Sequence, residues 1–168
     1  AVNTRTKEIC VASATCLTNF DLRQYLPVVV VGKGAGCAQS FVDTSGQNRL
    51  AIWNGLRTYN TPQNILNVLQ QIDPNFQSRQ YGIADMYNVP VTFTGTGAGL
   101  AKFGVVGVDG DVRYAIQGNV LTGNAVITSA ESAFLALQGD LTSRVMAAME
   151  AARALGGDGR CSCNPNAP

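Results

Sequence analysis

The chain has 168 residues, of which 46% are hydrophobic and 14% charged, and its formal net charge is +1. A chain of this length buries about 70% of its unfolded surface, which favours one globular domain. The near-neutral composition lacks the basic stripe of a nucleic-acid-binding protein. The high apolar and low charged content excludes disorder, and no apolar stretch is long enough to span a bilayer.

Histidine is absent from the sequence. This removes the usual general base near neutral pH and the commonest metal ligand. Hydrolases with a Ser-His-Asp or Cys-His centre are therefore excluded, as are zinc and haem sites with histidine ligands. We expect no catalytic residue in the chain, no metal site and no cofactor.

The first half of the chain predicts strands followed by a pair of helices. Apolar and β-branched runs bounded by glycine indicate a hairpin, and apolar residues at a 3.6-residue period indicate helices. The second helix begins at Thr61-Pro62, a capping residue followed by proline at the first helical position. In chain order the expected elements are strands at 8–14, 27–31 and 37–42 and helices at 47–59 and 62–73.

The second half repeats this order. Strands are expected at 77–86, 91–94 and 112–121, with a short strand inside the glycine-rich stretch 94–110. A helix beginning at Gly123-Asn124 ends before Gly139, and a last helix from Leu141 ends at Gly156-Gly157. Because helices come in pairs and strands in hairpins, the order predicts an α+β fold with antiparallel sheets.

The five cysteines and the low charge are typical of an oxidising, extracellular setting. An odd number of cysteines leaves at least one thiol free, bonded to another chain, or paired with a residue outside this sequence. Two cysteines separated by one residue rarely bond each other, so those near the C-terminus are expected to reach separate partners. The disulfide candidates are Cys10, Cys16, Cys37, Cys161 and Cys163.

Polar side chains at strand ends form the candidate ligand site. Gln39 and Ser40 end one predicted strand, and Gln117 and Asn119 lie on another. Together they would bind a small amide or a peptide. The alternative is that they only satisfy each other's hydrogen bonds, as buried polar groups nearly always do.

Several stretches, taken in order, resemble one known family. The strand Gln117–Leu121 and the terminal helix followed by Gly156-Gly157-Asp158 are the most specific of them. The chain is similar to the bacterial and archaeal family called domain of unknown function 1028, which is grouped with the N-terminal-nucleophile (Ntn) hydrolases. The other matching stretches are 36–42, 79–85, 114–123 and 139–152.

The resemblance implies a four-layer αββα Ntn-hydrolase-like sandwich of antiparallel sheets. Residues 1–158 would form this domain, and 159–168 a tail containing cysteine and proline. Family members begin with one further strand, which in Ntn hydrolases opens with the nucleophile, whereas Ala1 has no nucleophilic atom. They also end with a closing core strand, which Pro165 and Pro168 would break here. Two interpretations of the missing strands are open: the strands belong to the protein outside this sequence, or a strand from another chain completes the sandwich.

These features predict a secreted, disulfide-braced protein that assembles with itself into a filament, tube or layer. The expected partner is a second copy, joined by strand addition and an intermolecular disulfide. The first alternative is an Ntn-type amidohydrolase whose nucleophile lies upstream of Ala1. The second is a module that binds a small ligand or peptide through Gln39 and Asn119.

Overall fold

The computed structural model describes residues 1–161, in which two antiparallel sheets and five α-helices form a mixed α+β fold. One sheet has the strand order β2-β3-β4-β5, and the other has the order β1-β7-β6. The expected α+β class with antiparallel sheets is thus confirmed. The strands are β1 Val2–Asn3, β2 Pro27–Val30, β3 Gly34–Ser40, β4 Arg79–Asp85, β5 Val91–Thr94, β6 Phe103–Asp109 and β7 Val112–Gly118.

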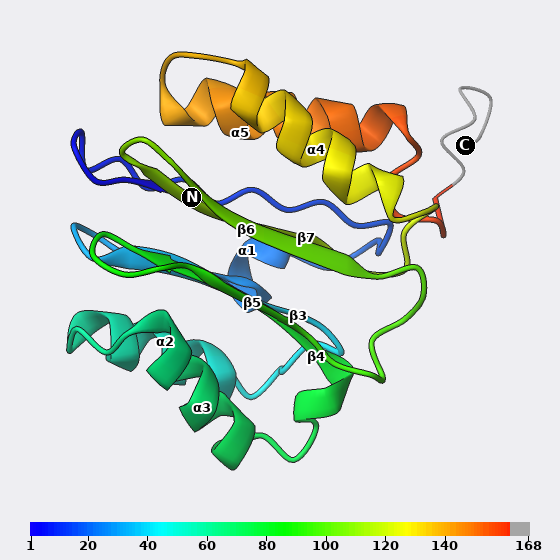
Figure 1. Cartoon of the computed structure of the whole chain (residues 1–168). Helices are drawn as coiled ribbons and strands as arrows, with labels where there is room; N and C mark the ends of the chain where they lie inside the picture. The colour runs from blue at the N-terminus through cyan, green and yellow to red at the C-terminus, as the bar shows by residue number, and fades with distance from the viewer. Residues whose placement is uncertain (162–168) are drawn as a thin grey trace.

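Figure 1 shows the two sheets lying face to face between two helix pairs. Helices α2 and α3 cover the outer face of the β2–β5 sheet, and α4 and α5 cover the outer face of the other sheet. The helices are α1 Leu22–Tyr25, α2 Gln47–Arg57, α3 Pro62–Ile72, α4 Ala125–Ala136 and α5 Leu141–Ala154.

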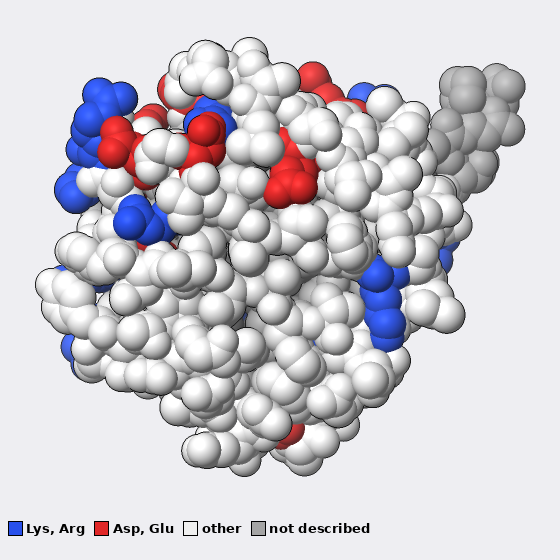
Figure 2. Space-filling model, in the orientation of Figure 1, with Lys and Arg blue, Asp and Glu red and all other residues white. Residues whose placement is uncertain are grey.

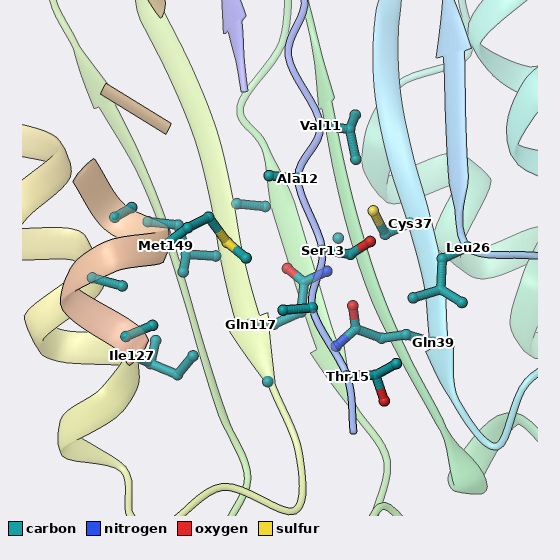
Figure 3. Close-up of a pocket in the computed structure, with 18 of the residues that line it drawn as sticks. Val11, Ala12, Ser13, Thr15, Leu26, Cys37, Gln39, Gln117, Ile127 and Met149 are labelled. Atoms are coloured by element: carbon teal, nitrogen blue, oxygen red, sulfur yellow. The ribbon is translucent and has the colours of Figure 1, made fainter. Parts of the chain in front are cut away.

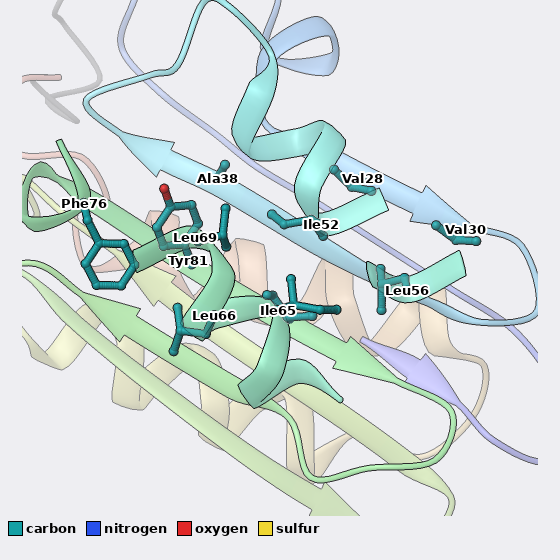
Figure 4. Packing of buried hydrophobic residues seen from close by; sticks show 11 residues of the cluster. Val28, Val30, Ala38, Ile52, Leu56, Ile65, Leu66, Leu69, Phe76 and Tyr81 are labelled. Carbon is teal, nitrogen blue, oxygen red and sulfur yellow. The ribbon is translucent and has the colours of Figure 1, made fainter. Parts of the chain in front are cut away.

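The α2–α3 pair packs on its sheet through one apolar cluster (Figure 4). Ile52 and Leu69 are fully buried there against Tyr81. The predicted cap of α3 is present, because Thr61 Oγ1 accepts a hydrogen bond of 3.2 Å from the Asn64 amide. Removal of this apolar surface from water is the main stabilisation of the layer.

The α4–α5 pair covers its sheet in the same way. Phe134 of α4 lies 5.0 Å, ring centre to ring centre, from Tyr114 of β7. Asp140 caps α5 by accepting a hydrogen bond of 2.9 Å from the Ser143 amide, which satisfies one of the free amides at the helix start. The buried cluster also includes Leu141, Val145 and Ala148 of α5.

Gln80 of β4 links the two sheets. Its side chain is fully buried, and Nε2 donates to Gly118 O of β7 at 3.0 Å and to Thr94 Oγ1 at 2.9 Å. Its Oε1 accepts a hydrogen bond of 2.8 Å from Gln39 Nε2. A buried amide that has all its partners fixes how the sheets sit on each other.

The prediction of a strand at residues 8–14 is wrong. Within that segment only Ile9 forms a β-bridge, to Val2. The local pattern suits a strand, but strand assignment needs a paired neighbour, and most of the segment has none among the described residues. The structure instead has the short strand β1 at Val2–Asn3 and the short helix α1, neither of which the sequence pattern predicted.

Candidate functional site

A cavity of about 270 Å³ lies between β7 and the extended segment 11–15. Figure 3 shows this segment running beside β7, with side chains of β3 on one side and of the helix pair on the other. Residues of α4 and α5 line the side of the cavity beneath the helices, and residues of β3 and β4 form its floor. We call this cavity the strand groove.

The β7 wall of the strand groove carries an unpaired edge. Strand β1 pairs with β7 only at Val2↔Arg113 and Asn3↔Val112, although β7 continues to Gly118. Thr4 N donates a hydrogen bond to Asp111 O, so the main-chain N–H and C=O groups of residue 111 point toward β1. In an antiparallel ladder the main-chain groups of every second residue after it point to the same side. The main-chain groups of Ala115 and Gln117 thus point into the groove.

The opposite wall is unpaired too. Ala1 and Cys10 exchange two main-chain hydrogen bonds, of 2.9 and 3.0 Å, as neighbours in an antiparallel pair do. After Cys10 the ladder stops, and Val11–Ala14 form no hydrogen bond with any residue of the described part of the chain. The groove therefore has two free backbone edges that face each other.

Cys37, Gln39 and Gly82 belong to the floor of the groove, which the β2–β5 sheet forms. Desolvation raises the pKa of the Cys37 thiol to about 11, so the thiol stays protonated at neutral pH. A Cβ on Gly82 would lie 2.3 Å from Gln117 Oε1, so the absence of a side chain at Gly82 lets the Gln117 amide pack against β4.

The structure brings all four predicted ligand-binding residues to the strand groove: Gln39, Ser40, Gln117 and Asn119 line it. Gln39 is held by Gln80. Gln117 Oε1 is buried and has no hydrogen-bond partner among residues 1–161. The side chains of Ser40 and Asn119 also form no hydrogen bond within this part of the chain. The groove thus presents unused polar groups from both sheets.

The cysteines fall into three groups. Cys16 and Cys161 form a disulfide, and Cys10 and Cys37 are free thiols. Cys163 lies outside the described residues. No three His, Cys, Asp or Glu side chains gather as a metal site in the part of the chain that the structure describes.

Pattern reasoning missed the segment 11–14 as a wall of the site, because it treated these residues as a paired strand. Their composition held a usable signal, since Ala12, Ser13 and Ala14 are small enough to line a narrow groove. Gln80 was missed as well. A polar residue inside an apolar strand indicates a buried hydrogen-bond network, and Gln80 forms one.

The family model described as "Family of unknown function (DUF1028)" matches residues 1–164. The chain belongs to the DUF1028 family. The resemblance seen in its strand and helix motifs is thereby confirmed. No curated protein matches the chain.

A solved structure supports the fold of this DUF1028 chain. Protein SPO2555 from Silicibacter pomeroyi, also described as DUF1028, superposes with a TM-score of 0.69 at 23% identity. The match covers 81% of this chain and only 60% of that protein. At this identity the likeness shows the fold alone.

The surface of the DUF1028 chain is sparsely charged. On the face drawn in Figure 2, charges of both signs gather near one edge and most of the surface is uncharged. No helix within residues 1–161 has the length and apolar character that a membrane crossing requires.

Proposed function

We propose that the chain is a secreted, disulfide-braced structural protein that assembles with itself on a non-catalytic, Ntn-hydrolase-like αββα sandwich. A neighbouring chain fills the strand groove by strand addition. The observation that carries the proposal is the pair of unpaired backbone edges, at Ala115–Gln117 on β7 and at Val11–Ala14, which face each other across the cavity.

Two facing edges make strand addition favourable. Unpaired N–H and C=O groups that lie away from water cost free energy comparable to a lost hydrogen bond. One strand in the groove would pair with both edges at once, which gives affinity through the main chain alone. It would also fill the apolar space beneath α4 and α5. Residues 1–158 act as the assembling domain in this proposal, and residues 159–168 as its tail.

The side chains of the groove favour binding over catalysis. The sequence has no histidine, and the Cys37 thiol, with its pKa raised to about 11, gives little thiolate at neutral pH. The polar groups that remain in the groove include the amides of Gln39, Gln117 and Asn119, which recognise ligands by hydrogen bonding and do not titrate.

The cysteines support an oxidising location. The Cys16–Cys161 disulfide closes the chain over a separation of 145 residues, and such bonds persist outside the cytosol. The proposal gives Cys163 the bond to a neighbouring chain. In this proposal an oxidising, extracellular location allows both the Cys16–Cys161 disulfide and the disulfide between chains.

Native mass spectrometry at micromolar concentration tests this proposal. We expect multimers before reduction and smaller species after it. The Cys163→Ser variant should form only the species held by strand addition, which makes it the matched control for the intermolecular disulfide. A protein that stays monomeric in all three samples would contradict the proposal.

An Ntn-type amidohydrolase is the second candidate, and one observation favours it. A chain that continued β1 upstream of Ala1 would bring a side chain between Gln39 and Gln117, where a nucleophile would have polar neighbours. The intact mass of the native protein separates the two candidates. A mature chain that begins with Thr, Ser or Cys after precursor cleavage would favour the amidohydrolase.

A further inference from the structure

We infer that the free edge of strand β2 and helix α2 above it together bind an extended peptide of another protein. The peptide adds to β2 as an antiparallel strand and carries an acidic, an apolar and an acidic residue at alternate positions. This inference goes beyond the self-assembly proposed above and does not use the strand groove.

Strand β2 lies at one edge of its sheet, because the strand order is β2-β3-β4-β5. Ala38 N donates a hydrogen bond to Leu26 O, so the main-chain groups of Leu26, and of every second residue after it, point toward β3. Those of Pro27 and Val29 point away from the sheet and have no partner among residues 1–161. Pro27 O, Val29 N and Val29 O are therefore free to bind another strand.

Helix α2 runs parallel to β2 and lies above it. A Cβ on Gly36, the β3 partner of Val28, would lie 2.8 Å from Ile52 Cγ2. One turn later along α2, Leu56 lies near Val30 (Figure 4). Successive turns of α2 therefore match successive alternate residues of β2.

Arg49, Trp53 and Arg57 form a stripe on one side of α2, since residues four apart share a face of a helix. Gly55 faces α3, because a Cβ there would lie 2.4 Å from Ile65 Cγ1. Trp53 precedes Gly55 by two residues, which is about 200° around the helix. Helix α3 lies over β4 and β5, so the stripe lies on the opposite side, along the free edge of β2.

The two arginines of the stripe have no acidic partner in the described part of the chain, since neither takes part in any of its ion pairs. Arg49 Nε is buried and lacks a hydrogen bond within residues 1–161. The Arg57 guanidinium lies 4.9 Å from the centre of the Trp53 ring, and Trp53 is 39% exposed. The stripe thus offers two uncompensated positive charges on either side of an exposed aromatic ring.

The spacing of the stripe fits a strand. Its successive members are about 6 Å apart along the helix, and alternate residues of a strand are about 6.6 Å apart. Cross-strand partners share one face of a sheet, so the peptide residues opposite Val28 and Val30 face α2 as those two valines do. The peptide therefore presents acidic side chains to Arg49 and Arg57 and an apolar side chain to Trp53.

The sequence itself does not contain this pattern. The two acidic residues of the peptide are four positions apart, and no two acidic residues of the 168 have that separation. No segment of these residues in a second copy therefore fits the stripe, and the charge of the stripe points to an acidic segment of a different protein.

Fluorescence of Trp53 tests the inference, because Trp53 is the one tryptophan of the chain. The probe is acetyl-Thr-Glu-Thr-Leu-Thr-Glu-Thr-amide, and its analogue has Gln in place of both Glu residues. We expect a saturable change with the probe and about tenfold weaker binding of the analogue, because two exposed ion pairs are lost. Arg57→Gln should reduce this preference to about threefold, whereas the control Arg153→Gln, on α5, should keep it.

A second analogue tests strand addition. It has N-methyl groups on the two threonines beside the leucine, which keep every side chain but remove the donors to Pro27 O and Val29 O. We expect this analogue not to bind.

Inversion of one charge tests the register without depending on stability. In an antiparallel strand the first acidic residue of the probe lies opposite Arg57 and the second opposite Arg49. The Arg57→Glu variant should therefore prefer the probe with Lys at the first of these positions over the probe with Lys at the second. The two peptides have the same composition, so a folding defect would weaken both equally.

The outcomes separate this inference from the proposed self-assembly. The expected preferences support it even if native mass spectrometry finds only monomers. No fluorescence change at millimolar probe, equal binding of the Gln analogue, binding of the N-methyl analogue, or any other preference of Arg57→Glu overturns it. Multimers of the native protein would still support assembly in each of these cases.

Discussion

Arg79 Nε lies 2.8 Å from Asp73 Oδ2, and both side chains are buried where β4 begins. Tyr81 donates its hydroxyl proton to the same carboxylate at 2.8 Å, and Asn48 Nδ2 donates to it at 2.8 Å. Arg79 also donates to Phe41 O. This network ties the end of α3 and the start of β4 to the start of α2, so the packing of the two helices on the sheet depends on one charged carboxylate.

The charge of Asp73 predicts a loss of stability in acid. Burial alone would raise the pKa of Asp73, but hydrogen bonds from Arg79 and Tyr81 outweigh it and lower the pKa to about 2. The contribution of ionised Asp73 to the free energy of unfolding is therefore complete above its ordinary pKa of 3.8, and it is lost as the pH falls toward 2. We expect the free energy of unfolding to drop by about 2 kcal/mol over this range.

Urea unfolding at a series of pH values measures this acid dependence. Asp73→Asn is the control, because it removes the titrating group; it should be less stable at pH 7 and should show a flatter decline in acid. An equally steep decline in both proteins would contradict the assignment to Asp73.

Gln80→Leu should destabilise the protein by about 2–3 kcal/mol, because it leaves several buried groups of both sheets without partners. Gly118 O, Thr94 Oγ1 and Gln39 Nε2 all lose a hydrogen bond. Thermal and urea unfolding measure the effect. The control Gln63→Leu changes an exposed residue of α3 and should stay within about 0.5 kcal/mol of the native protein.

Gly34→Ala should destabilise by about 3 kcal/mol, since an added Cβ would lie 2.6 Å from Ala84 O and 2.9 Å from Asp85 Cα. Both contacts are with backbone, so neither yields by a rotamer change. Gly123→Ala is the matched control, because a Cβ there meets nothing within 4 Å. Equal stability of the two variants in denaturant unfolding would refute this packing argument.

Loss of the Cys16–Cys161 disulfide should cost about 4–5 kcal/mol, because it closes a loop of 145 residues and so restricts the unfolded chain strongly. Unfolding in urea with and without reductant measures this difference. Cys16→Ser should reproduce the reduced protein and should not respond further to reductant. A large response of that variant to reductant would assign the effect to another cysteine.

Local patterns in the sequence were sufficient to predict helices α2 to α5 and most strands. The period of Ile65 and Leu69, together with the Thr61-Pro62 start, predicts α3 within a residue of its bounds, because capping and periodicity act over a few residues. The same kind of pattern failed at 8–14. Whether an extended segment becomes a strand depends on a neighbour, and no local pattern supplies one.

The strand groove depended on tertiary structure more than the individual helices and strands did. The sequence determined the composition, the strand ends that carry Gln39 and Gln117, and the set of cysteines available for pairing. Only the packing of one sheet on the other brought these two amides to the same groove and chose Cys161 as the partner of Cys16. Contacts between residues far apart in the chain arise from how whole layers pack, and short-range preferences do not encode that.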